Sequence, residues 1–168
     1  MLEMTAESFA EVWKRSSGVE FLLAIVQGRV PLPAHAIDVG LAIEAVTPGR
    51  IELSWRPPVR LTNLVGFVHG GYVAIALDDA SGLSCASLED RFRPMLTLSL
   101  SVDFLRPVRP ETRYRTLGEV VHSGGTRTIA DARIIDPDGK LVARASGTFT
   151  PNRAFDPSLD PRASENTR

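Results

Sequence analysis

The sequence predicts an α+β fold in which an antiparallel sheet packs around one long buried helix. Three observations predict it. A strand hairpin follows a helical beginning, a long helix rich in small residues comes next, and four segments with strand character complete the pattern. Strands joined by short turns pair antiparallel, and a single long helix in such a chain must bury itself against the sheet.

Size and composition set the limits of this prediction. The 168 residues, 43% of them apolar, suffice for one globular domain with a substantial core. Nineteen basic and twenty acidic residues leave a formal charge of −1, so no overall field favours nucleic acid or an anionic membrane. Cys85 is the single cysteine and is expected to be a small buried residue in a reducing compartment.

The beginning of the chain does not read as a targeting segment. Residues 1–8 carry acids where a signal peptide has Lys or Arg, and no apolar run approaches the length of a membrane span. We therefore expect a cytoplasmic protein with neither a membrane nor a nucleic acid as partner.

Residues 1–33 are expected to form a helical preface that packs over one end of the sheet. Apolar residues keep helical spacing from residue 6 to residue 27, with a break at 16–18, and two prolines at 31 and 33 end the pattern. A strand hairpin should follow over residues 39–46 and 51–55, around a Thr-Pro-Gly-Arg turn.

The long helix is expected over residues 70–88, followed by a strand over 97–105 that alternates strictly. One face of this strand should pack on the helix or core, and the other should meet solvent or a partner. The first face holds Leu98, Leu100, Val102 and Phe104, and the second holds Thr97, Ser99, Ser101 and Asp103.

Three further strands should follow over residues 114–121, 126–135 and 141–150, with turns at 122–125 and 136–139. Residues 151–168 hold too few apolar side chains to order themselves and are expected to form a flexible tail. The globular domain should therefore span residues 34–150.

The candidate catalytic residues are concentrated in the stretch from Asn63 to Gly82. Gly70 and Gly71 let the backbone approach a ligand, and the first amides of a helix that starts there have no partner within it. Such free donors favour a developing negative charge. One face of the helix carries Gly71, Ala74, Asp78 and Gly82, so a carboxylate stands among residues with almost no side chain.

The same stretch carries the motif N-x-x-G-x-x-H-G-G, followed by an acid nine residues after the histidine. The motif residues are Asn63, Gly66, His69, Gly70, Gly71 and Asp78. In this it resembles the PaaI-type acyl-CoA thioesterases of the hotdog-fold superfamily, and the resemblance extends over residues 36–150. It implies hydrolysis of aromatic (phenylacetyl-type) or medium-chain acyl-CoA. It implies no metal and no cofactor, because coenzyme A is part of the substrate and product.

Thioester hydrolysis needs a donor for the carbonyl oxygen and a group that activates water. The Gly70 amide could supply the donor, and Asp78 could act either as general base or as nucleophile. The resemblance implies that Thr97 positions the water and that Asn63 helps set the site.

The resemblance also implies a homodimer or a homotetramer. Two protomers would pair their long helices and extend the sheet, with Asp78 and Thr97 from one protomer and His69, Gly70 and Asn63 from the other. Coenzyme A would lie against Gly71 and against the turn after the fourth strand, with Arg106 as a further phosphate partner. The residues of that turn are His122, Ser123, Gly124, Gly125, Thr126 and Arg127.

Structural alternatives stand beside these roles. His69 could serve only the start of the helix, Thr97 could be an ordinary strand residue, and Arg127 could be a solvated one. Asp79 is expected at the surface or in an interface. Walls of the acyl pocket are expected from Tyr72, Met95 and the N-terminal helices.

Two other functions stay open at the level of the sequence. One is a protein that binds or senses acyl-CoA without hydrolysing it, and the other is a dehydratase or hydratase that acts on acyl carriers.

Overall fold

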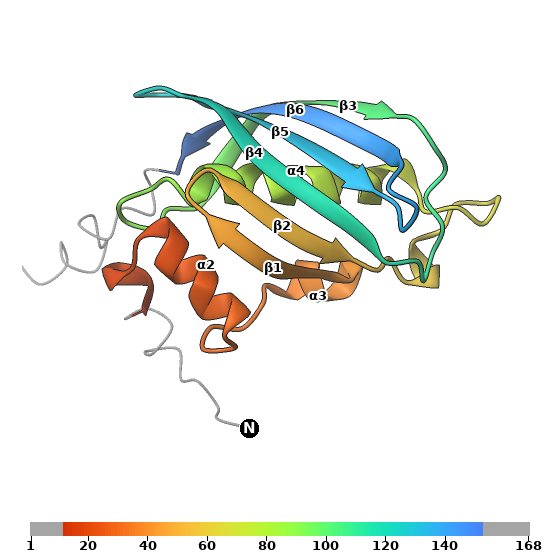
Figure 1. Ribbon diagram of the computed structural model, residues 1–168, viewed down its shortest axis with the longest axis horizontal. Helices are drawn as coiled ribbons and strands as arrows, with labels where there is room; N and C mark the ends of the chain where they lie inside the picture. Colours follow the sequence, from red (N-terminus) through yellow and green to blue (C-terminus); the bar gives the residue numbers. More distant parts are fainter. Residues whose placement is uncertain (1–11, 153–168) are drawn as a thin grey trace, which may run out of the picture.

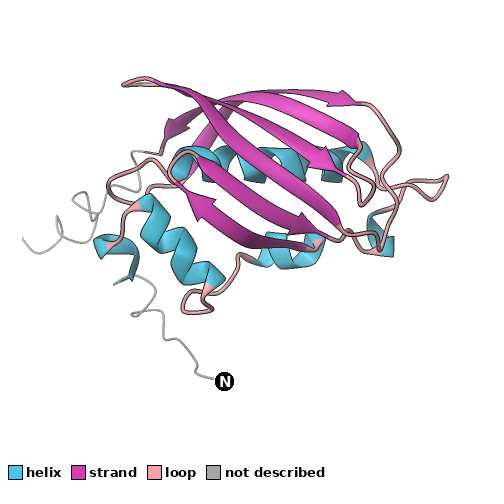
Figure 2. Cartoon of the chain, in the orientation of Figure 1, coloured by secondary structure: helices cyan, strands magenta, loops and turns pink. Residues whose placement is uncertain are grey.

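The computed structural model describes residues 12–152, in which an antiparallel sheet of six strands curves around the helix α4 (Figures 1 and 2). The strands lie in the order β1-β2-β4-β5-β6-β3 and every neighbouring pair is antiparallel. This confirms the predicted α+β class. The strands are β1 (Leu41–Thr47), β2 (Arg50–Trp55), β3 (Met95–Phe104), β4 (Tyr114–Ser123), β5 (Thr128–Ile135) and β6 (Leu141–Pro151).

The helix α4 (Gly70–Ala86) is the element on which the sheet packs. Ala76, Leu77 and Ala80 on its sheet-facing side are completely buried. The approach is so close that a Cβ atom on Gly118 of β4 would lie 2.0 Å from the carbonyl oxygen of Ala80. Small residues on both elements therefore let this helix lie against the sheet.

The N-terminal helix α2 (Gly18–Val26) packs on the edge strand β1, not over one end of the sheet as predicted (Figure 1). Ser17 and Glu20 form a capping box at its start, which explains the break expected near this position. The part of the preface expected at residues 6–11 lies outside the described residues.

A further short helix, α3 (Ala34–Val39), was not predicted, and β1 consequently begins at Leu41 and not at Val39. Pro33 precedes the helix, and Gly40 ends it with a φ of 80°. A proline before and a left-handed glycine after a segment are helix signals, but six residues are too few to show helical periodicity.

The strand β3 contains a β-bulge that changes which face Thr97 occupies. Thr97 pairs with Phe149 and Ser99 pairs with Thr148, so Leu98 is an extra residue on this strand. Phe149 is buried against the helix side, and Thr97 therefore faces α4 together with Leu100, Val102 and Phe104. The predicted placement of Thr97 beside Ser99, Ser101 and Asp103 was wrong, because strict alternation does not hold across a bulge.

The ends of β4 and β6 are among the strand limits that differ from the prediction. The strand β4 continues through His122 and Ser123, so the turn that follows comprises residues 124–127, where the Gly124 N–H donates to the Arg127 carbonyl at 2.9 Å. Pro151, placed in the tail, is the last residue of β6, while residues 153–168 lie outside the described part of the chain.

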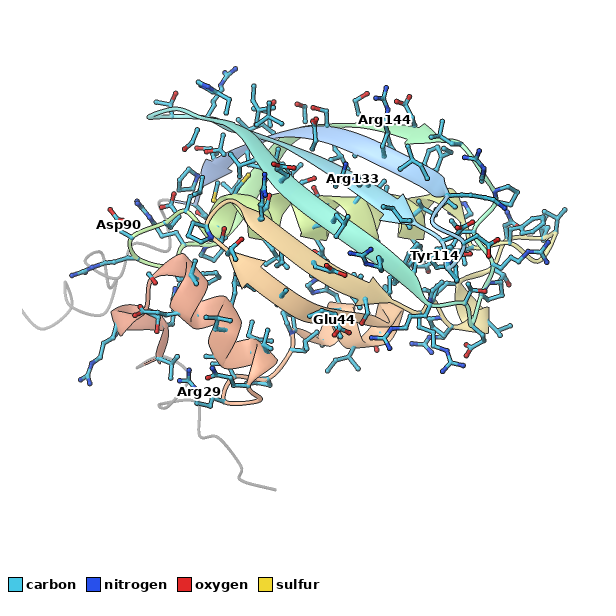
Figure 3. All side chains as sticks on the ribbon, in the orientation of Figure 1. Arg29, Glu44, Asp90, Tyr114, Arg133 and Arg144 are labelled. Carbon is cyan, nitrogen blue, oxygen red and sulfur yellow. The ribbon has the colours of Figure 1, made fainter. Side chains whose placement is uncertain are left out.

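The outer face of the sheet is polar and carries ion pairs between strands. Arg144 of β6, which Figure 3 shows projecting away from α4, donates to Asp103 of β3 at 2.8 Å. Such exposed pairs contribute little to stability, about 0–1 kcal/mol each. Among the described residues, no helix has the length and apolar character needed to cross a membrane.

Candidate active site

The first turn of α4 leaves one main-chain donor free. His69 is the N-cap, and its Nδ1 accepts a hydrogen bond from the Gly71 N–H at 3.0 Å. The N–H groups of Tyr72 and Val73 both donate to the His69 carbonyl. Within residues 12–152 the N–H of Gly70 has no acceptor, so this amide is the free donor at the positive end of the helix.

Asp78 lies two turns further along α4, on the side that faces β3. Thr97 Oγ1 donates a hydrogen bond to Asp78 Oδ1 at 2.9 Å, across 19 residues of sequence. The bulge at Leu98 makes this contact possible, because it turns Thr97 toward the helix. The structure therefore joins the predicted acid to the predicted hydroxyl and leaves the second carboxylate oxygen, Oδ2, available.

Asn63 organises the loop that leads into α4. Its side-chain oxygen accepts hydrogen bonds from Val65 and Phe67 at 3.0 and 3.2 Å, and its main chain pairs with Phe67 and Gly66. Gly66 adopts a φ of 83°, a conformation that glycine tolerates best. The loop therefore holds His69 and Gly70 at the entrance of the helix, and its tip exposes Leu64 and Val65.

Within one chain, Gly70 N–H and the Asp78 carboxylate do not lie close enough together to contact the same carbonyl group. Eight residues separate them on one helix, which corresponds to about 12 Å along its axis. A thioester carbonyl oxygen that accepts a hydrogen bond from Gly70 N–H must lie within hydrogen-bond distance of that nitrogen. The water oxygen that attacks the same carbonyl must lie within hydrogen-bond distance of the Asp78 carboxylate. The two groups can therefore serve one substrate only if they come from different protomers.

The turn assigned to coenzyme A lies apart from the start of α4. Figure 1 shows the tip between β4 and β5 at the end of the molecule where α4 ends, opposite the loop from which α4 begins. His122 and Arg127 are exposed, and among the described residues neither forms an ion pair. Arg106, the other candidate, donates a hydrogen bond to the Leu141 carbonyl.

Asp79, expected at the surface or in an interface, is half-buried in the single chain. Its side chain is only 23% exposed, and its carboxylate contacts His35 Nε2 of α3 at 3.2 Å. Burial raises the pKa of Asp79, and the contact with His35 opposes that shift. Sequence reasoning did not find this pair, because 44 residues separate its members and no motif connects them.

Cys85 is buried, as expected, and burial raises the pKa of its thiol to about 12. It is therefore an inert core residue and not a nucleophile. Among the described residues, no group of three or more His, Cys, Asp and Glu side chains is arranged to hold a metal ion.

Comparison with known proteins adds to this geometry. Residues 65–143 match the family model described as "Thioesterase superfamily". The medium/long-chain acyl-CoA thioesterase YigI of Escherichia coli is 30% identical, over 66% of this chain and 81% of that protein.

Two solved structures are also similar. One is a putative thioesterase from Ralstonia eutropha related to phenylacetic acid degradation, with 28% identity, a TM-score of 0.70, and coverage of 77% of this chain and 98% of that one. The other is a hypothetical thioesterase from Streptococcus pneumoniae with coenzyme A, with 27% identity, a TM-score of 0.62, and coverage of 67% and 89%.

The chain therefore belongs to the thioesterase superfamily. It has the hotdog fold and the PaaI-type signature predicted from the sequence, and it is a thioester hydrolase.

Proposed function

We propose that the enzyme hydrolyses an aromatic or medium-chain acyl-CoA to the free acid and coenzyme A. The observation that supports this best is the hydrogen bond from Thr97 to Asp78, because it holds a carboxylate in the orientation that activation of water requires. The free N–H of Gly70 is the complementary group for the carbonyl oxygen.

In the proposed reaction Asp78 acts in one of two ways. As a general base it takes a proton from water while the water oxygen bonds to the carbonyl carbon. The C–S bond then breaks, and the thiolate of coenzyme A takes up that proton. As a nucleophile the carboxylate itself bonds to the carbonyl carbon and expels the thiolate, and water then hydrolyses the resulting anhydride. Both routes place the developing negative charge at Gly70 N–H.

We propose that the site forms between two protomers that associate through the β3 edge. Leu96, Leu98 and Phe104 on this edge strand are 46%, 52% and 57% exposed, which is unusual for large apolar side chains on one strand. Association there would extend the sheet and bring the start of one α4 toward Asp78 of the other. The end of β4 at His122 and Ser123 and the turn at residues 124–127 would then supply contacts to coenzyme A, with Arg127 as the phosphate partner.

Two relatives support this reading. The Escherichia coli relative is named an acyl-CoA thioesterase, and the Streptococcus pneumoniae relative was solved with coenzyme A. Two further structures of the latter are variants in which an aspartate or a threonine is replaced by alanine, the two residue types that meet here in Asp78 and Thr97.

The test is hydrolysis of a panel of acyl-CoA thioesters by wild type and by Asp78→Asn, followed through release of free thiol. We expect the variant to lose about a thousandfold in kcat while it keeps its fold and still binds acyl-CoA. Thr97→Val should lose less, because it removes only the group that orients the carboxylate.

Full activity in Asp78→Asn would refute the assigned mechanism. Binding of acyl-CoA without thiol release by the wild type would instead favour a sensing protein, and addition of water to an enoyl-CoA would favour a hydratase.

A further inference from the structure

A small cavity of about 60 Å³ lies between the N-terminal helices, the strands β1 and β2, and α4. Nine of its eleven lining residues are apolar, among them Leu32, Ala36, Ile43 and Leu83. The other two are His35 and Asp79. Tyr72 and Met95, which the sequence suggested as pocket walls, do not belong to its lining.

The position of the cavity relates it to the reaction. Asp79 lines it and directly follows Asp78 on α4, and the two side chains differ in direction by about 100°. Leu83 lines it one turn further along the same helix. Asp78 and the cavity therefore lie on adjacent faces of the same helix.

The two polar groups of the lining satisfy one another. The Asp79 carboxylate contacts His35 Nε2 at 3.2 Å, and the His35 side chain is 57% exposed, so this pair stands at the solvent margin. The remaining surface that the cavity offers is hydrocarbon. A guest without hydrogen-bonding groups would fit such a lining, because it leaves no buried polar atom unpaired.

We propose that this cavity receives the far end of the acyl group and that the enzyme consequently prefers an aliphatic chain to an aromatic ring. This inference rests on the proposed thioesterase function. A volume of about 60 Å³ leaves room for a few carbon atoms at the end of a chain. A cavity that binds benzene has about 150 Å³, more than twice as much.

The segment that closes the cavity is the loop and helix ahead of β1. Leu32, Pro33, His35 and Ala36 all come from it, and the contact between His35 and Asp79 fastens it to α4. The helix α3, which begins at Ala34, forms one wall of the cavity, so its position limits the depth of the acyl pocket. The chain length that the enzyme accepts is therefore encoded partly outside the signature motif.

Two variants with opposite effects test the inference. Ala36→Val adds two carbon atoms to the lining, and Leu32→Ala removes three from a half-buried side chain. With acyl-CoA substrates from acetyl to dodecanoyl, Ala36→Val should shorten the preferred chain by about two carbons. It should also lower kcat/KM for longer chains about tenfold relative to shorter ones. Leu32→Ala should shift the preference toward longer chains.

The matched control is Ala45→Val, which makes the same change on the exposed side of β1, away from the cavity. It should leave the chain-length profile as in the wild type.

Two results would overturn the inference: the same profile in wild type, Ala36→Val and Leu32→Ala, or a wild-type preference for phenylacetyl-CoA over every aliphatic substrate. Absence of thiol release from all substrates would refute the proposed function itself, which distinguishes the two failures.

Discussion

Gly70 contributes its main chain to the proposed site, and this can be tested by removing one N–H group. It is the first residue of α4, where proline is well tolerated, and the preceding His69 has the extended conformation that proline requires. Gly70→Pro should therefore keep the helix and lower kcat by a factor of 10² to 10³, since it deletes the donor to the carbonyl oxygen.

Gly70→Ala is the matched control, because it retains the N–H. Its added methyl group would meet the Phe104 ring at 3.4 Å, an ordinary contact. Thiol-release kinetics of the two variants should differ by at least about tenfold. Equal kinetics would show that the N–H does not stabilise the transition state.

Asp79 should make stability depend on pH in the direction set by its raised pKa. Burial disfavours its charged form, so its stabilising contribution is fully present below the unfolded pKa, near 3.8, and is lost as pH rises through the folded pKa. Asp79→Asn cannot ionise and escapes this loss. The Tm of the variant relative to wild type should therefore rise as the pH increases above about 4.

Thermal unfolding at several pH values measures this difference. Asp38→Asn, at an exposed position of α3, is the control for removal of one negative charge. A Tm difference for Asp79→Asn that falls as pH rises would mean that the contact with His35 outweighs the cost of burial.

The edge strand β3 contributes to the proposed site in two ways. Its bulge directs Thr97 toward Asp78, and its exposed apolar side chains form the proposed contact with a second protomer. Leu98→Lys should raise the dimer dissociation constant about a hundredfold, because an unpaired ammonium would be buried in the contact. Activity should fall with it while the circular dichroism of the fold is unchanged.

Ile37→Lys is the matched control, since Ile37 is also an exposed apolar residue, 62% exposed on α3. Light scattering coupled to size-exclusion chromatography gives the mass of each variant. A dimer that survives Leu98→Lys with normal activity would exclude the β3 edge as the contact.

Local patterns predicted most of these elements but not their fine placement. The Gly-rich start of α4 and the Asp-Pro-Asp-Gly turn before β6 are written in adjacent residues, so the helix and strands there could be predicted. The side of the sheet to which Thr97 belongs depends on the register between β3 and β6, which brings together residues about 50 positions apart. Alternation along one strand contains no information about such a bulge.

The candidate site also contains a part that local sequence predicts and a part that depends on contacts between distant residues. The motif placed Asn63, His69, Gly70 and Asp78 on one loop and one helix, and their local geometry follows from short-range hydrogen bonds. The contact between His35 and Asp79 could not be predicted, because it depends on how α3 docks on α4. Nothing in the spacing of those two residues distinguishes them from solvated charges.

In the molecule as a whole, α2 packs on one edge of the sheet, β1, and no other element of residues 12–152 covers the opposite edge, β3 (Figure 2). Gly70 and Asp78 lie about 12 Å apart along a single helix. A second copy of the chain is therefore part of the proposed site and not an accessory to it. A twofold arrangement would give two equivalent sites per dimer, each with groups from both protomers.

Subunit mixing tests this claim most directly. Asp78→Asn and Gly70→Pro should each be nearly inactive alone, yet a mixed dimer contains one site with Asp78 from one chain and Gly70 from the other. After unfolding and refolding of an equimolar mixture, random pairing should restore about one quarter of wild-type activity. Activity that stays at the average of the two separate variants would contradict a site shared between protomers.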